Sequence, residues 1–129
     1  MNKIISLLLV LCAVLSLTSC DAENEGNTYE QISQAEAKAL MDQESGYIIL
    51  DVRTEEEYNA GHIEGAILIP DYEVAEKAEG ILTNKDQLIL VYCRSGRRSK
   101  LAAEELVKLG YTNIKEFGGI IDWTYGTVT

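Results

Sequence analysis

From Tyr29 onward, runs of apolar residues typical of buried strands alternate with stretches that have the periodicity of helices. The strongest strand pattern is QLILVYC, residues 87–93. An amphipathic helix pattern follows over residues 97–109 and ends at Gly110. Strands separated by helices run parallel and are covered on both faces. The sequence therefore predicts an α/β fold built around a parallel sheet.

Two capping boxes and several shorter apolar runs predict the remaining elements. Ser33 with Glu36, and Thr54 with Glu57, have the spacing that starts a helix. The second of these helices should stop by Gly61. Strands are expected at 47–52, 66–70 and 113–117, a helix over 71–79 ended by Gly80, and a final helix after a turn at Gly118-Gly119.

Size and charge limit the class of protein. The chain has 129 residues, 47% of them hydrophobic and 25% charged, which suits one soluble domain with a core. A formal net charge of −10 argues against nucleic acid as a ligand, because phosphate backbones require a broad basic surface. One short basic stretch is better suited to a single small anion.

The first residues have the pattern of an export signal. Lys3 precedes an almost wholly apolar segment, residues 4–17, which is too short to span a bilayer. The sequence Leu17-Thr18-Ser19-Cys20 resembles the lipobox of bacterial lipoproteins. That resemblance implies cleavage before Cys20 and lipidation of its thiol, which would hold the protein on the outer side of a bacterial membrane. An ordinary signal peptide is the alternative.

These patterns predict three segments. Residues 1–19 are the signal peptide, residues 20–28 an acidic flexible tether, and residues 29–129 the folded domain. Cys12 leaves with the signal and Cys20 carries the lipid, so Cys93 is the one free thiol of the mature chain. A lone thiol in an exported protein is either buried and inert or kept for chemistry.

The position of Cys93 favours chemistry. It ends the central strand just before a helix begins, which is where open α/β sheets bind ligands. Gly96 lets the link between strand and helix curl, so that successive N–H groups can point inward as an anion-binding nest. A sulfur inside such a nest is stabilised as the thiolate, which is the nucleophilic form.

The basic residues after the thiol also indicate an anion. Arg97, Arg98 and Lys100 lie in the first helical turn, where the helix dipole favours acidic residues. No acidic residue occurs between Asp86 and Glu104, in a chain that contains 21. A solvated basic surface is the simpler reading, but an anion bound in the loop accounts for both the position and the charge.

Three motifs together resemble the single-domain rhodaneses, a family of sulfurtransferases. They are DVRTEEEYNAGHIEGAILIP at 51–70, CRSGRRS at 93–99 and GGIIDW at 118–123. The resemblance extends from Tyr29 to about Trp123. It implies a rhodanese-like α/β fold with a central, mostly parallel five-stranded sheet flanked by helices on both faces.

The resemblance also implies roles for individual residues. Cys93 would be the nucleophile that carries a persulfide. His62 is less suited to a general-base role, because Gly61-His62-Ile63 more readily packs a loop between helix and strand. The implied substrate-binding residues are Arg94, Ser95, Gly96, Arg97 and Arg98, and the implied supporting residues are Asp51, Arg53, His62 and Ser99.

The implied reaction moves sulfur from thiosulfate, or a similar small sulfur-containing anion, through Cys93 to a thiol or cyanide. It requires no metal and no organic cofactor, and its partners are a thiol acceptor or reductant protein and the membrane surface. We expect a monomer.

Two other interpretations of the sequence remain. A Cys-based phosphatase or arsenate reductase would need Cys-x5-Arg, but that position holds Ser99. A membrane-tethered persulfide carrier without free turnover would have the same loop.

Overall fold

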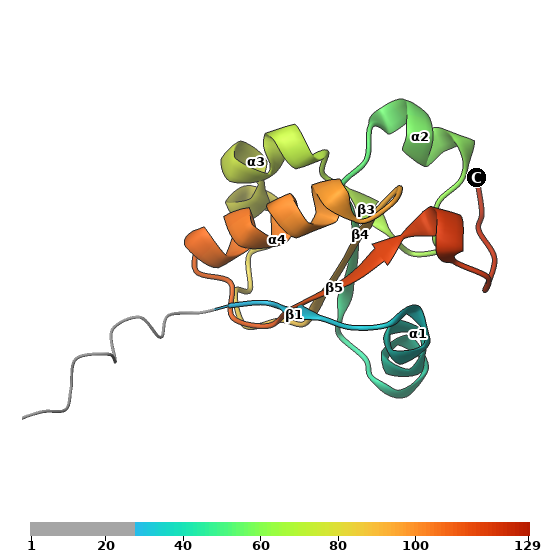
Figure 1. Cartoon of the computed structure of the whole chain (residues 1–129). Helices are drawn as coiled ribbons and strands as arrows, with labels where there is room; N and C mark the ends of the chain where they lie inside the picture. Colours follow the sequence, from blue (N-terminus) through green and yellow to red (C-terminus); the bar gives the residue numbers. More distant parts are fainter. Residues whose placement is uncertain (1–27) are drawn as a thin grey trace, which may run out of the picture.

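A five-stranded, all-parallel sheet forms the centre of the molecule, with strand order β1-β5-β4-β2-β3 (Figure 1). The structure is a computed structural model, and it describes residues 28–129. The strands are β1 (Glu30–Gln31), β2 (Ile48–Asp51), β3 (Ile67–Leu68), β4 (Ile89–Cys93) and β5 (Ile114–Gly119).

Helices cover both faces of this sheet. In Figure 1, α3 and α4 lie on one side and α1 lies on the other, while α2 lies beyond one end of the strands. The helices are α1 (Gln34–Gln43), α2 (Glu55–Ala60), α3 (Val74–Ile81) and α4 (Arg97–Lys108). Two 3₁₀ turns, Asp71–Glu73 and Ile120–Asp122, complete the elements.

Strand β4 separates two apolar cores because its side chains alternate between the faces. Ile89, Val91 and Cys93 point toward the core under α3 and α4. Leu90 and Tyr92 belong to the second core, which packs against α1. All five residues of β4 are buried, as expected for a central strand of a parallel sheet. The predicted α/β architecture, with Cys93 at the carboxyl end of a central strand, is confirmed.

Both predicted capping boxes are present. Ser33 and Glu36 exchange hydrogen bonds at the start of α1, and Thr54 and Glu57 do the same at the start of α2. As expected, α2 ends at Ala60, and its C-cap is Gly61.

The structure corrects several of the predicted elements. Gly80 does not end the third helix, because α3 continues to Ile81. Gly118 and Gly119 are not a turn but the last residues of β5, and only a 3₁₀ turn follows them instead of a helix. Strand β1 has no counterpart in the prediction, since two exposed residues carry no periodic pattern.

The predicted signal peptide, the lipobox with Cys20, and all of the tether except Thr28 lie outside the described residues. Within residues 28–129, no helix is both long enough and apolar enough to cross a membrane.

Candidate active site

The loop from Cys93 to α4 curls around the sulfur atom. Gly96 is the N-cap of α4 and has a left-handed backbone, with φ of 111°, which favours glycine. This conformation brings the Gly96 N–H to 3.0 Å from Cys93 Sγ. The thiol is 1% exposed, yet a backbone amide donates to it. The predicted curl is therefore present, and Cys93 lies at the bottom of the loop.

Gly119 holds the loop against the end of β5. The amide of Ile121 donates to the Arg94 carbonyl at 3.2 Å. A Cβ atom on Gly119 would lie 2.0 Å from that carbonyl oxygen and 2.5 Å from the Cα of Ser95. The backbones can pass this closely only because residue 119 has no side chain. Gly119 is thus part of the site, which the sequence analysis did not anticipate.

A buried carboxylate lies beneath the loop. The Ser99 hydroxyl is 3.4 Å from Cys93 Sγ and 2.5 Å from Oε2 of Glu116 on β5. The Gly118 N–H donates to the same carboxylate oxygen at 2.9 Å. Ser99 and Glu116 are almost completely buried. Ser99, one of the expected supporting residues, therefore lies between the thiol and this carboxylate.

Sequence reasoning missed Glu116, although a signal for it exists. Residues two apart in a strand share a face, so Glu116 lies on the same face as the apolar Ile114. An acidic residue on the buried face of a strand must find donors in the interior.

The three loop arginines are not equivalent. Arg98 forms a two-pronged ion pair with Glu57 of α2, with Nη1–Oε1 at 2.8 Å and Nη2–Oε2 at 3.0 Å. The hydrogen bonds from Arg98 lower the pKa of Glu57 to about 2. Arg94 and Arg97 are exposed, as is Ser95, and neither guanidinium forms an ion pair within residues 28–129.

Asp51 and Arg53, two of the expected supporting residues, form an ion pair with each other. Arg53 Nη2 is 2.7 Å from Asp51 Oδ2, and both residues are buried. The Tyr92 hydroxyl donates to the same Asp51 oxygen at 2.6 Å and accepts from the Ile63 N–H at 3.1 Å. Burial, together with the hydrogen bond to Asp51, raises the pKa of Tyr92. These groups join β2 and β4 to the chain that enters β3.

His62 lies in the connection between α2 and β3. Its ring stacks on Tyr58, with centroids 3.8 Å apart, and its Nδ1 is 2.9 Å from the Tyr58 carbonyl. Its backbone pairs with Val128 as an antiparallel bridge. These contacts fit the expected packing role.

A cavity of about 350 Å³ adjoins the loop on the side of Arg94. Two arginines and several apolar side chains line this cavity, and Cys93 does not. The lining residues are Arg53, Glu57, Ala60, Gly61, Arg94, Ile120, Ile121 and Thr127.

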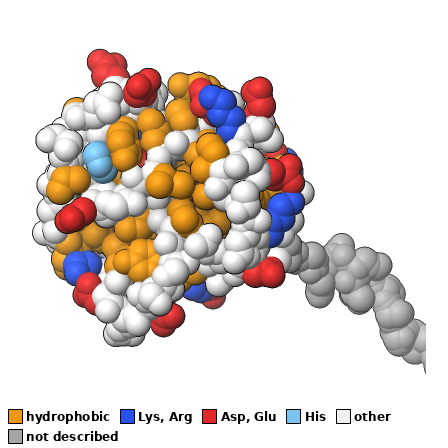
Figure 2. Space-filling model, turned by 180° about the vertical axis from the view of Figure 1, so that it is seen from behind, with side chains coloured by type: hydrophobic (Ala, Val, Ile, Leu, Met, Phe, Trp, Pro, Cys, Tyr) orange, Lys and Arg blue, Asp and Glu red, His pale blue; other side chains and the backbone are white. Residues whose placement is uncertain are grey.

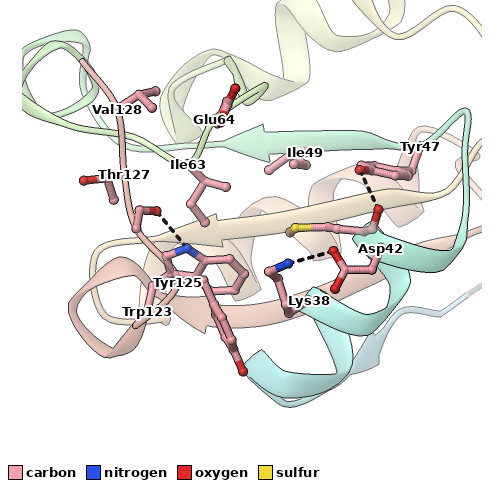
Figure 3. A pocket seen from close by; sticks show the side chains of 12 residues that line it. Lys38, Asp42, Tyr47, Ile49, Ile63, Glu64, Trp123, Tyr125, Thr127 and Val128 are labelled. Atoms are coloured by element: carbon pink, nitrogen blue, oxygen red, sulfur yellow. Dashed lines mark hydrogen bonds and ion pairs between the residues drawn. The ribbon is translucent and has the colours of Figure 1, made fainter.

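A larger cavity, about 440 Å³, lies elsewhere, between α1, β2 and the C-terminal segment (Figure 3). Trp123 and Tyr125 form one wall, and Ile49 and Ile63 lie at its apolar side. Figure 2, which shows the molecule from behind, shows apolar side chains gathered on the face in view. Trp123 is half-buried and lines this cavity. None of the residues of the Cys93 loop lines it.

Comparisons with known proteins identify the family. A model of the rhodanese-like domain matches residues 33–125. The chain is 41% identical over 73 residues to the thiosulfate sulfurtransferase PspE of Escherichia coli (strain K12), covering 57% of this chain and 70% of that protein. It is 36% identical over 104 residues to the putative sulfur carrier protein YrkF of Bacillus subtilis (strain 168), covering 80% of this chain but 55% of the relative.

Solved structures agree with the sequence matches. A rhodanese with anions from E. coli superposes with a TM-score of 0.60 at 37% identity, covering 64% of this chain and 98% of that one. A rhodanese-related protein from Thermoplasma volcanium has a TM-score of 0.67 at 33% identity, covering 78% of this chain and 98% of that one. The fold, the motif order and these matches together show that the chain belongs to the rhodanese-like domain family.

Proposed function

We propose that this protein is a thiosulfate sulfurtransferase that carries sulfur as a persulfide on Cys93. The observation that supports this most is the Cys93 sulfur at the bottom of a closed loop, where the Gly96 amide donates to it at 3.0 Å. Arg94 and Arg97, with no ion-pair partner within residues 28–129, lie on the same loop. The loop thus combines a nucleophile with groups that attract an anion.

The transfer proceeds in two displacements. The Cys93 thiolate attacks the outer sulfur of thiosulfate, a new S–S bond forms, and sulfite leaves with the electrons of the broken S–S bond. The Gly96 amide stabilises the negative charge on Cys93 Sγ before the attack and again when the thiolate is restored. A thiol or cyanide then attacks the outer sulfur of the persulfide, and the Cys93 thiolate is restored.

Thiosulfate as the donor is supported by two relatives. PspE is named a thiosulfate sulfurtransferase, and so is thiosulfate sulfurtransferase 18 of Arabidopsis thaliana, which is 32% identical over 114 residues and is covered to 82% of its length. The solved rhodanese from E. coli is described with anions. Because Arg98 is held by Glu57, we assign the first contact with the donor to Arg94 and Arg97.

A second candidate is a persulfide carrier that receives sulfur from another protein. The relative YrkF is named a putative sulfur carrier protein, and the match covers 55% of its length. Cys93 is 1% exposed, which suits an acceptor that reaches it only after docking at the loop. The two candidates share the Cys93 persulfide and differ in whether free thiosulfate is turned over.

Turnover of thiosulfate by the full chain discriminates between them. Thiosulfate and cyanide are supplied in excess, and thiocyanate is counted per protein molecule, with Cys93→Ser as the control. An enzyme produces many thiocyanates per molecule, and the control produces none. If the wild type never produces more than one thiocyanate per protein molecule, free turnover is rejected and the persulfide carrier remains as the candidate.

We also propose that the chain is lipid-anchored through Cys20 on the outer side of a bacterial membrane. The support is the sequence Leu17-Thr18-Ser19-Cys20 after an apolar segment. In cells, the wild type should fractionate with membranes and take up labelled fatty acid. Cys20→Ser should do neither. Equal labelling of both proteins would reject the anchor.

A further inference from the structure

The Cys93 thiol is connected to the Glu116 carboxylate by a chain of two short contacts through one hydroxyl group. Cys93 Sγ donates toward Ser99 Oγ at 3.4 Å, and Ser99 Oγ is 2.5 Å from Glu116 Oε2. A serine hydroxyl carries a single hydrogen but can also accept. The shortest of the Ser99 contacts is the one to Glu116, so its hydrogen points at the carboxylate and its lone pairs face the thiol.

Glu116 is almost completely buried, and it forms no ion pair within residues 28–129. Its neighbours across the sheet, Gln31 on β1 and Val91 on β4, carry no charge. Some charged side chains on the neighbouring elements pair with other groups: Lys115 with Glu30, Glu36 with the Ser33 cap, and Arg98 with Glu57. Of the other charged residues of α4, Glu105 is half-buried, and Arg97, Lys100, Glu104 and Lys108 are exposed.

We propose that Glu116 accepts the proton of the Cys93 thiol through Ser99, which makes Glu116 a positioning residue for the thiolate. This inference rests on the proposed sulfur transfer, because it concerns how the nucleophile of that reaction is formed. The S–H bond breaks as an O–H bond forms on Ser99. The original Ser99 O–H bond breaks as an O–H bond forms on Glu116. No charge is created, and the negative charge moves from the carboxylate to the sulfur.

Both ends of the proton transfer have hydrogen-bond donors for the negative charge. Glu116 Oε2 receives hydrogen bonds from Ser99 and from the Gly118 N–H. The sulfur receives the Gly96 N–H and lies at the start of α4, where the helix dipole stabilises negative charge. After the transfer, Ser99 donates to the thiolate, so no buried group loses its partner.

A shared proton gives a distinctive dependence on pH. When two groups share one proton, its position depends on their relative affinities and not on the pH, over the range in which the pair holds one proton. The thiolate fraction then stays constant as the pH falls. When a thiol titrates independently, its thiolate fraction falls about tenfold for each pH unit below the pKa of the thiol.

Alkylation of Cys93 by iodoacetamide in the full chain measures this thiolate fraction. Trypsin releases residues 86–94, which contain Cys93 but neither Cys12 nor Cys20, so mass spectrometry follows the one thiol. The wild-type rate should become independent of pH below neutrality. Glu116→Gln and Ser99→Ala should lose this plateau and fall about tenfold per pH unit. Glu104→Gln, an exposed charge change on α4, should keep it.

Several outcomes would overturn the proposal: a wild type without a plateau, a plateau that survives in Glu116→Gln, or one that survives in Ser99→Ala. If Glu116→Gln does not fold, the pH profiles of the wild type and of Ser99→Ala still test the proposal. The readout needs no sulfur donor. A wild type that shows the plateau but forms no persulfide would reject the proposed function and leave the proton transfer intact.

Discussion

Glu57 of α2 and Arg98 of α4 form a two-pronged ion pair beside the Cys93 loop, with contacts of 2.8 and 3.0 Å. The pair joins a helix of the DVR motif to the helix that follows the thiol. It also neutralises one of the three arginines that the motif resemblance assigns to anion binding. The Arg98 guanidinium therefore braces the loop, and Arg94 and Arg97 remain for an incoming anion.

This ion pair should affect stability in a defined pH range. The folded-state pKa of Glu57 is about 2, below the ordinary 4.5, so the ion pair stabilises the fold above about pH 4.5 and is lost as the pH falls toward 2. Glu57→Gln, which can still cap α2, should be less stable than wild type at pH 7 by roughly 0.5–1 kcal/mol. The difference should vanish near pH 2. Urea unfolding at both values tests this, with the exposed Glu56→Gln as the control. A difference that does not depend on pH would contradict it.

Donor binding should depend on the two exposed arginines. Charge-assisted contacts to an anion are strong, so Arg94→Ala and Arg97→Ala should each raise KM for thiosulfate about tenfold or more. The kcat should change less, because neither residue contacts Cys93 Sγ. Lys108→Ala removes an exposed charge at the far end of α4 and should leave KM unchanged. If neither arginine variant alters KM, the donor binds elsewhere.

The two glycines that differ most in their surroundings should respond in opposite ways to alanine. Gly119→Ala places a Cβ 2.0 Å from the Arg94 carbonyl oxygen, so the loop must open or β5 must shift, at a cost of about 1–3 kcal/mol or more. Gly80→Ala meets nothing within 4 Å in α3 and should be neutral or stabilising by up to about 1 kcal/mol. Thermal unfolding measures the stability of both variants, and Cys93 alkylation reports whether the loop has opened. Equal stability of the two variants would show that the loop does not require the bare backbone at 119.

The Asp51–Arg53 pair should matter for stability rather than for chemistry. In Arg53→Met, the buried Asp51 carboxylate keeps only the Tyr92 hydroxyl and the main-chain N–H of residue 53 as donors. This substitution should lower the free energy of unfolding by about 3–5 kcal/mol. Any variant that folds should retain kcat for thiosulfate, because the pair does not touch Cys93. A large loss of kcat in a fully folded protein would assign Arg53 to the reaction instead.

The sequence predicted the position of the thiol because strong local signals define it. The buried run ending at Cys93, the capping boxes and Gly96 each reflect short-range physics, and each has its expected structure. The features that were not predicted depend on contacts between distant segments. Glu116 and Gly119 lie more than twenty residues from Cys93 in the chain, and only the pairing of β4 with β5 brings them to the loop. Likewise, nothing local indicated that Glu57 would bind Arg98.

Sulfur transfer by this protein requires that Cys93 carry the transferred sulfur atom. Its most direct test is mass spectrometry of residues 86–94 after the folded full chain has been incubated with thiosulfate and the free thiols blocked. This peptide should gain the mass of one sulfur atom, and a reducing thiol should remove it. A peptide that stays unmodified with thiosulfate, with polysulfide and with a low-molecular-weight persulfide would contradict the account.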